Sequence, residues 1–376
     1  MIAELPSRNF HPLVYGVGAW TDNLPFAYDL VATLRPRLLV ELGVDRGESY
    51  FTFCQSAAEN ATGTSCFGID SWTGDEHVGG YDETTFREVS EHNAERYAAF
   101  STLLRCNFDD ALPQFAPESI GLLHIDGRHT ESAVRHDVES WLPKLEPGGI
   151  LLMHDVSVQT RGFGVWKVWN ELKSHRRSFT FENGPGLGVW QKPPARSLPE
   201  PVETLLSGDA TQLVNYYASQ AHKIREQIAA DWQSGAVRHN AIGKQTIVQV
   251  FYGAPYSEEN SVLTRIGHGE WKSLALRLPP DCDASWIRVD FISPLTTIEI
   301  KSIAVQANED RVFSAALPNE FDAIRIAGDC RREPHDKLLC LQITGLDPQL
   351  YLPQLRTRRG EIALLLELRV DSKNAA

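Results

Sequence analysis

Residues 38–49, with the sequence Leu-Leu-Val-Glu-Leu-Gly-Val-Asp-Arg-Gly-Glu-Ser, constrain the fold of this chain more than any other segment. An apolar run ends in Glu41, and Gly43 and Gly47 follow before a helical pattern begins at Glu48. A continuous apolar run is typical of a parallel strand buried on both faces, and glycine permits a tight turn. We therefore expect a strand, a turn and a helix N-terminus, where a nucleotide-like cofactor can bind.

Asp45 distinguishes this turn from the turns of dinucleotide-binding enzymes. Those turns carry three glycines, in the pattern G-x-G-x-x-G, and hold a pyrophosphate. Here Asp45 stands where a glycine is expected, and its carboxylate would repel a pyrophosphate. S-adenosylmethionine suits such a turn better, because it has a sulfonium and an ammonium group but no phosphate. Glycine turns also serve plain packing, so this motif alone leaves both interpretations open.

Polar residues also end the later apolar runs. Residues 65–70 end in Asp70, which follows Gly47 at about the 20-residue distance that brings an acid to a ribose diol. Residues 120–126 end in Asp126, and the run at 150–153 is followed by His154 and Asp155. The carboxyl ends of neighbouring parallel strands lie at one edge of a sheet, so we expect these groups to lie together.

The first half of the chain alternates strand and helix patterns. Further strands are expected at 101–106, 179–182 and 187–191, and helices at 24–34, 84–100 and 164–174. This alternation predicts an α/β fold with a doubly wound sheet.

A second domain is expected because 376 residues exceed one ordinary core. Four prolines within residues 192–201 indicate a linker, and a helical pattern at 210–232 follows it. Short β-rich runs separated by turn residues occupy the rest and predict a β-sandwich. The predicted domains are residues 1–192 for the α/β domain, 193–240 for a proline-rich linker and helix, and 241–376 for a β-sandwich accessory domain.

Charge and composition exclude several classes of partner. The net charge of −13 argues against non-specific binding to nucleic acid, which needs a basic surface. No apolar run reaches the length of a membrane span, and the N-terminal residues do not resemble a signal peptide, so we expect a cytoplasmic protein. The six cysteines form no C-x-x-C pair, which favours free thiols.

Several separated motifs resemble those of class I S-adenosylmethionine-dependent methyltransferases. They are V-E-L-G-V-D-R-G-E-S, F-G-I-D-S-W-T-G-D, L-L-H-I-D-G-R-H-T, W-L-P-K-L-E-P-G-G and G-F-G-V-W, between residues 38 and 191. More narrowly, the chain is similar to a bacterial subgroup with H-I-D-G-x-H-T after the fourth strand and H-D after the fifth. That subgroup is often associated with surface-glycan modification. The resemblance implies a Rossmann-like methyltransferase sheet.

The resemblance also implies a cofactor site. Its members are Glu41, Gly43, Gly47, Asp70, Trp72, Asn107 and Asp126. Glu41 is expected beside the methionine ammonium or the first turn, the two glycines along the amino-acid moiety, and Asp70 on both ribose hydroxyls. Trp72 and Asn107 are expected near the adenine.

Methyl transfer to an alcohol needs an oxygen in line with the methyl group and a base for the proton. His129 and His154 are the candidate bases, because histidine titrates near neutral pH, and Asp155 completes the catalytic set. In the alternative, Asp126 and Asp155 hold Mg²⁺, which acidifies a hydroxyl. Related metal-dependent enzymes carry two acids or Asp-Asn after the fifth strand, whereas His154 and Asp155 stand here.

These interpretations predict an O-methyltransferase that uses S-adenosylmethionine and acts on a sugar hydroxyl, in a surface-polysaccharide or nucleotide-sugar pathway. The alternative is a non-catalytic glycan-binding or scaffold protein on the same fold. The expected partner is a small-molecule or glycan acceptor, without nucleic acid and without a membrane span. Assembly into a homo-oligomer is left open.

Overall fold

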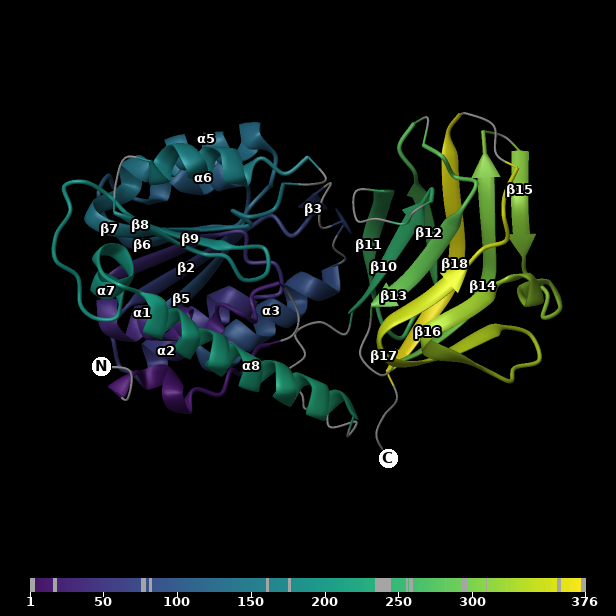
Figure 1. Ribbon diagram of the computed structural model, residues 1–376, viewed down its shortest axis with the longest axis horizontal. Helices are drawn as coiled ribbons and strands as arrows, with labels where there is room; N and C mark the ends of the chain where they lie inside the picture. Colours follow the sequence, from purple (N-terminus) through teal and green to yellow (C-terminus); the bar gives the residue numbers. More distant parts are fainter. Residues whose placement is uncertain are drawn as a thin grey trace. The chain divides into compact units, whose positions relative to one another are not determined.

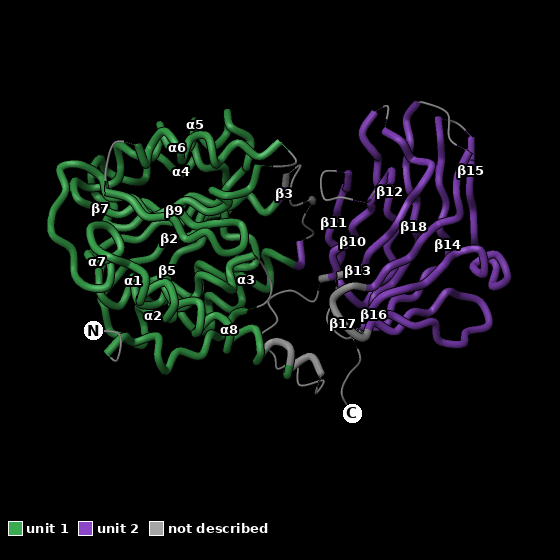
Figure 2. The backbone as a smooth tube through the Cα atoms, viewed as in Figure 1, with its two compact units in different colours: residues 1–72, 85–231, 238–242 green, residues 73–84, 232–237, 243–376 purple. Residues whose placement is uncertain are grey.

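The computed structural model describes residues 4–15, 19–75, 79–80, 83–159, 162–174, 177–233, 245–254, 256, 260–280, 282–292, 296–308, 310–356 and 360–372. The chain divides into two compact units, shown in Figure 2. The first contains residues 1–72, 85–231 and 238–242, and the second contains residues 73–84, 232–237 and 243–376. Each unit is described by itself.

The first unit is built on a mixed sheet with the strand order β5-β2-β1-β6-β7-β9-β8 (Figure 1). The strands are β1 (Leu38–Leu42), β2 (Ser65–Asp70), β5 (Ser101–Arg105), β6 (Ile120–Ile125), β7 (Leu145–His154), β8 (Ser178–Phe181) and β9 (Leu187–Gln191). Strands β5, β2, β1, β6 and β7 run parallel, and β9 runs antiparallel to β7 and β8. The order reverses between β1 and β6, which is where open α/β sheets bind ligands. The predicted doubly wound sheet is confirmed.

Helices cover both faces of this sheet. Figure 1 shows α5 (Glu131–Trp141) and α6 (Val165–Lys173) on one face, and α1 (Leu24–Leu34), α2 (Glu48–Glu59) and α8 (Thr211–Gln233) on the other. The other α-helices of the described residues are α3 (Glu83–Arg96) and the short helices α4 (Phe108–Ala111) and α7 (Val202–Ser207). Because side chains alternate along β1, Leu39 joins the core under α1 and α2, whereas Val40 and Leu42 join the core under α5 and α6.

Helix α8 packs on the first unit through a buried polar contact as well as through apolar side chains. Leu213 and Tyr217 are buried in the core shared with α1. Asp29 of α1 is fully buried, and its carboxylate accepts hydrogen bonds from the backbone N–H and the hydroxyl of Ser7 at 2.7 and 2.6 Å. The Ser7 hydroxyl also lies 2.9 Å from the Tyr216 hydroxyl of α8. The apolar face of this helix therefore forms part of a core.

The second unit is an antiparallel sheet with the path β11-β10-β13-β17-β14-β18-β12, and β15 and β16 pair with β14 and β17. The strands are β10 (Gln245–Tyr252), β11 (Ser261–Gly267), β12 (Lys272–Arg277), β13 (Ile287–Ile292), β14 (Thr296–Ala307), β15 (Asp310–Ala315), β16 (Arg325–Glu333), β17 (Leu339–Tyr351) and β18 (Ile362–Ser372). Its two end strands, β11 and β12, lie against each other, so the sheet is nearly closed around one core. The expected sandwich-like domain is confirmed.

Strands β11, β15 and β16 were not expected from the sequence. Each forms a hydrogen-bonded ladder with only one described strand, and β15 and β16 consist largely of exposed or half-buried residues. Edge strands of this kind lack the alternation of apolar and polar residues on which a sequence-based prediction depends.

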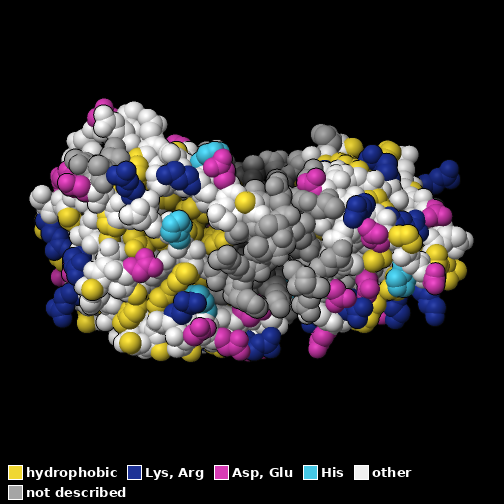
Figure 3. Space-filling model, turned by 90° about the horizontal axis from the view of Figure 1, so that it is seen from below, with side chains coloured by type: hydrophobic (Ala, Val, Ile, Leu, Met, Phe, Trp, Pro, Cys, Tyr) yellow, Lys and Arg dark blue, Asp and Glu magenta, His cyan; other side chains and the backbone are white. Residues whose placement is uncertain are grey.

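The molecular surface is mixed in charge. On the face drawn in Figure 3, Lys and Arg side chains are interspersed with Asp and Glu on both units instead of gathering in one basic area. Among the described residues, no helix is both long and apolar enough to cross a bilayer.

The buried carboxyl of Asp29 makes the stability of the protein depend on pH. Burial raises the pKa of Asp29 to about 6, against the hydrogen bonds from Ser7, which favour the charged form. The folded state thus binds this proton more tightly than the unfolded state does, so stability is lost as the pH rises from about 4 to about 6. Asp29→Asn removes this titrating group. We therefore expect the free energy of unfolding of the variant, relative to that of the wild type, to rise by about 3 kcal/mol between pH 4 and 7. Urea unfolding across this range measures it, and parallel stability curves would contradict it.

Candidate functional site

The glycine turn between β1 and α2 has a left-handed backbone at three positions, Gly43, Asp45 and Gly47, with φ of +91°, +49° and +81°. The Gly43 N–H donates to the Ile69 carbonyl of β2 at 2.9 Å. A Cβ on Gly43 would overlap the backbone carbonyl of Asp126 at the end of β6. Gly43 is therefore required both by its φ and by the approach of β6.

Asp70 organises this turn. One carboxylate oxygen accepts the N–H groups of Val44 and Asp45 at 2.9 and 3.0 Å, and the other accepts the N–H of Trp72 at 2.7 Å. Burial raises the pKa of Asp70 to about 6, although these three bonds favour its charged form. A carboxylate has about four lone-pair sites, so this arrangement leaves about one for a ligand hydroxyl.

Glu41 lies beneath the turn. Its side chain is fully buried, it accepts a hydrogen bond from the Ser49 hydroxyl at 2.6 Å, and its second oxygen lies 3.5 Å from Nδ1 of His124 on β6. Burial raises its pKa, against the effect of His124. Glu41 therefore supports the first turn of α2 from inside the protein.

The residues predicted near the adenine lie at the ends of β2 and β5. Trp72 is 2% exposed, packs against Phe86 with ring centroids 4.8 Å apart, and donates its indole N–H to the Asp45 carbonyl at 2.9 Å. Asn107 is exposed at the N-terminus of α4, and its amide donates to Asp110 at 3.1 Å.

Two histidines and two aspartates form a cluster where β6 and β7 end. Nε2 of His129 lies 2.9 Å from Oδ2 of Asp155 and 3.8 Å from Oδ1 of Asp126. Nδ1 of His154 lies 3.4 Å from Oδ2 of Asp126 and 3.5 Å from Oδ2 of Asp155. We call these four side chains the His/Asp cluster. The structure thus brings together the predicted bases and the predicted acids.

Local backbone geometry explains how adjacent residues join one cluster. Successive side chains of a strand point to opposite faces, so His154 and Asp155 would diverge in an extended chain. Asp155 instead has φ of +61°, a conformation that non-glycine residues rarely adopt and that re-aims its carboxylate toward His154. His129 is held by its ring stacking on Phe163, with centroids 4.6 Å apart, and by its carbonyl accepting the Gly164 N–H at 2.7 Å.

The histidines and aspartates of the His/Asp cluster shift one another's pKa values. Burial alone would lower the pKa of His129, but hydrogen bonds to Asp126 and Asp155 raise it to about 10. Burial would also lower the pKa of His154, but the charges of Asp126 and Asp155 outweigh it and raise this pKa well above its usual value. Burial would raise the pKa of Asp155, yet the charge of His154 and the hydrogen bond from His129 lower it to about 2. The two carboxylates therefore favour the charged form of each histidine, and each histidine favours the charged form of the carboxylates.

Asp126, His154 and Asp155 each offer one atom that could ligate a metal ion, and these atoms lie within 4.8 Å of one another. The set mixes an imidazole nitrogen with two carboxylate oxygens, whereas Mg²⁺ prefers oxygen ligands in octahedral geometry. His129 also directs Nε2 at Asp155, which places a cationic group where the metal would bind. The residues present therefore fit Mg²⁺ poorly.

Trp20 also contacts the His/Asp cluster, although it was not among the residues predicted from the sequence. Its indole N–H donates to Oδ2 of Asp126 at 3.0 Å, and its ring stacks on His154 with centroids 5.2 Å apart. No motif marks Trp20, because it lies outside the strand ends and contacts the cluster only through the fold. His136, by contrast, pairs with Asp109 on the surface.

Part of the first unit is similar to a known protein family. Residues 40–156 match the model of a family described as a methyltransferase domain. The first unit has the Rossmann-like fold of a methyltransferase domain. A curated relative from Sinorhizobium fredii, named "Uncharacterized protein y4gI", is 40% identical over 232 residues, which are 61% of this chain. The match spans only 25% of the length of that relative.

Solved structures of O-methyltransferases also resemble this chain. The putative caffeoyl-CoA O-methyltransferase from Staphylococcus aureus is 14% identical, with a TM-score of 0.36, covering 45% of this chain and 82% of that one. TomG from Streptomyces achromogenes, solved in complex with S-adenosylmethionine, is 14% identical with a TM-score of 0.36, covering 47% and 81%.

Gly43→Ala tests the contact between the turn and β6. The added Cβ must displace the Asp126 backbone, so we expect a loss of roughly 4 kcal/mol or more in unfolding free energy. Gly63→Ala is the matched control, because Gly63 has φ of +74° and open space around its Cβ position. We expect about 1 kcal/mol there, from backbone strain alone. Equal losses in urea unfolding would show that the close approach contributes nothing.

Proposed function

We propose that the first unit is an S-adenosylmethionine-dependent O-methyltransferase. The observation that carries the proposal is the direct contact between the glycine turn and the backbone of Asp126, which joins the cofactor turn and the His/Asp cluster into one site. The site lies at the carboxyl ends of β1 and β6, where the strand order reverses. The match of residues 40–156 to a methyltransferase domain supports the same conclusion.

We propose that the cofactor lies across the ends of β1, β2 and β5. Its amino-acid part lies along the turn of Gly43 and Gly47, whose left-handed backbone sets the path of the chain there, and Asp126 borders the same turn. Asp70 accepts a ribose hydroxyl through its remaining lone pair while it keeps its bonds to the turn. Trp72 and Asn107 flank the adenine. Glu41 acts from below by fixing Ser49 and thus the first turn of α2.

S-adenosylmethionine, held by the turn and by Asp70, would supply an electrophilic methyl group to an acceptor hydroxyl. The protein must then take up the hydroxyl proton. His129 and His154 each direct one ring nitrogen at the carboxylates of Asp126 and Asp155, which stabilise the imidazolium that proton uptake creates. A histidine must first lose its proton to act as the base, and a cation arriving beside the carboxylates lowers its pKa.

We propose a hydroxyl of a sugar as the acceptor, in a surface-polysaccharide or nucleotide-sugar pathway. The support is the resemblance of the motifs to the glycan-associated subgroup, in which His-Ile-Asp-Gly-Arg-His-Thr follows β6 and His-Asp ends β7.

Isothermal titration tests the cofactor. We expect S-adenosylhomocysteine to bind and NAD not to bind, because the turn carries Asp45 in place of a glycine. Asp70→Ala removes the carboxylate that accepts hydrogen bonds from the turn and, in this proposal, from the ribose. We therefore expect the binding free energy of S-adenosylhomocysteine to the variant to weaken by roughly 1–3 kcal/mol. Wild-type protein that binds no S-adenosylhomocysteine would overturn the proposal, and unchanged affinity in the variant would remove the ribose role of Asp70.

Transfer of labelled methyl groups to a panel of nucleotide sugars tests the chemistry. We expect turnover to persist in EDTA, because the donor set fits Mg²⁺ poorly, and Asp155→Asn to reduce kcat by roughly 100-fold through the misoriented histidines. Loss of turnover in EDTA, restored by Mg²⁺, would assign Asp126 and Asp155 to a metal instead.

A further inference from the structure

We propose that Trp20 is a positioning residue that ties the start of α2, at the cofactor turn, to the His/Asp cluster. This inference rests on the proposed methyltransferase function. Trp20 lies in the segment before α1 and is 4% exposed.

One end of the connection is the backbone of Trp20. Its N–H donates to Oε2 of Glu48 at 3.1 Å, and the hydroxyl of Thr21 donates to Oε1 of Glu48 at 2.8 Å. Glu48 is the first residue of α2 and directly follows Gly47 of the turn. Both oxygens of one buried carboxylate therefore fix the path of the chain at Trp20.

The other end is the indole. Its N–H donates to Oδ2 of Asp126 at 3.0 Å, the oxygen that also faces Nδ1 of His154. Its ring stacks on the His154 ring at an interplanar angle of 29°, and it meets the His124 ring edge to face with centroids 4.8 Å apart. A neutral donor and a stacked ring thus fix the rotation of both Asp126 and His154.

This arrangement predicts a separation between cofactor binding and turnover. The indole contacts the cluster, whereas the turn is held by Asp70 and Glu41. Without the N–H, the Asp126 carboxylate can rotate away from His154, and a small misplacement of a catalytic group costs far more in rate than in cofactor affinity.

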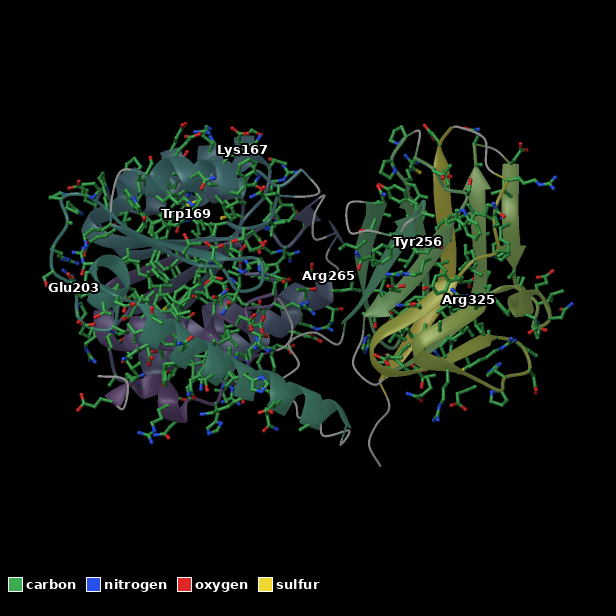
Figure 4. The ribbon with its side chains drawn as sticks, in the orientation of Figure 1. Lys167, Trp169, Glu203, Tyr256, Arg265 and Arg325 are labelled. Atoms are coloured by element: carbon green, nitrogen blue, oxygen red, sulfur yellow. The ribbon has the colours of Figure 1, made fainter. Side chains whose placement is uncertain are left out.

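Trp20→Phe keeps an aromatic ring and removes only the N–H donor. The matched control is Trp169→Phe: Trp169, labelled in Figure 4, is 1% exposed on α6, and its indole donates to the Thr180 hydroxyl at 3.0 Å. The two variants lose the same chemical group from a buried site. Only one of them loses it beside the His/Asp cluster.

We expect Trp20→Phe to lower kcat by roughly 10- to 100-fold, with the dissociation constant of S-adenosylhomocysteine changed by less than about 3-fold. Trp169→Phe should change neither quantity by more than about 3-fold at a similar melting temperature. Equal kcat in the two variants would overturn the proposal, as would a loss of cofactor affinity that matches the loss of kcat. Failure of the proposed function is distinguishable, because wild-type protein would then show no binding and no turnover.

Glu48→Gln is the second variant, for use if Trp20→Phe does not fold. It keeps the length of the side chain but replaces one charged acceptor with an amide, which loosens the hold on the Trp20 backbone. We expect kcat to fall in the same direction, by roughly 3- to 10-fold. An unchanged kcat would overturn the connection between α2 and the cluster.

Discussion

The packing of the Gly43 turn directly on the backbone at the end of β6 is the constraint on which the site depends. Because Gly43 has no side chain, the end of β1 can lie so close to Asp126 and Gly127 that a Cβ would overlap their backbone. Gly127 is crowded in turn, because a Cβ there would overlap the ring of Phe108. The loop that carries His129 therefore begins at a fixed place beside the turn, so the turn and the His/Asp cluster share one edge of the sheet.

Charge compensation allows ionisable groups to be buried at this edge of the sheet. Four ionisable groups lie largely out of water, where an unpaired charge would be costly, and each carboxylate faces an imidazole. Behind them the buried Glu41 faces His124, and Trp20 packs against both His124 and His154. The site is thus organised before any ligand arrives, and preorganised charges stabilise a developing cation without further rearrangement.

Periodicity in the sequence predicted most of the elements in the first unit. Strand β2 and helix α1 have the expected bounds, because each is a short apolar or amphipathic run with a clear stop, such as the Arg35-Pro36 step after α1. Strand β7 begins five residues earlier than expected, because its first residues contain Pro147 and two glycines, which read as a turn. The edge strands β15 and β16 carry little periodicity, since only one side of each is paired and few of their residues are buried.

The sequence by itself determined which polar groups end the parallel strands, and therefore that Asp70, Asp126, His154 and Asp155 lie at one edge of the sheet. Only the tertiary structure decided what those groups contact. Asp70 is occupied by three backbone N–H groups, Glu41 is enclosed beneath the turn, and the indole of Trp20 reaches Asp126 across more than a hundred residues of sequence. The physical reason is that strand ends follow from local pattern, whereas hydrogen-bond partners and burial depend on distant segments that meet only when the chain is folded.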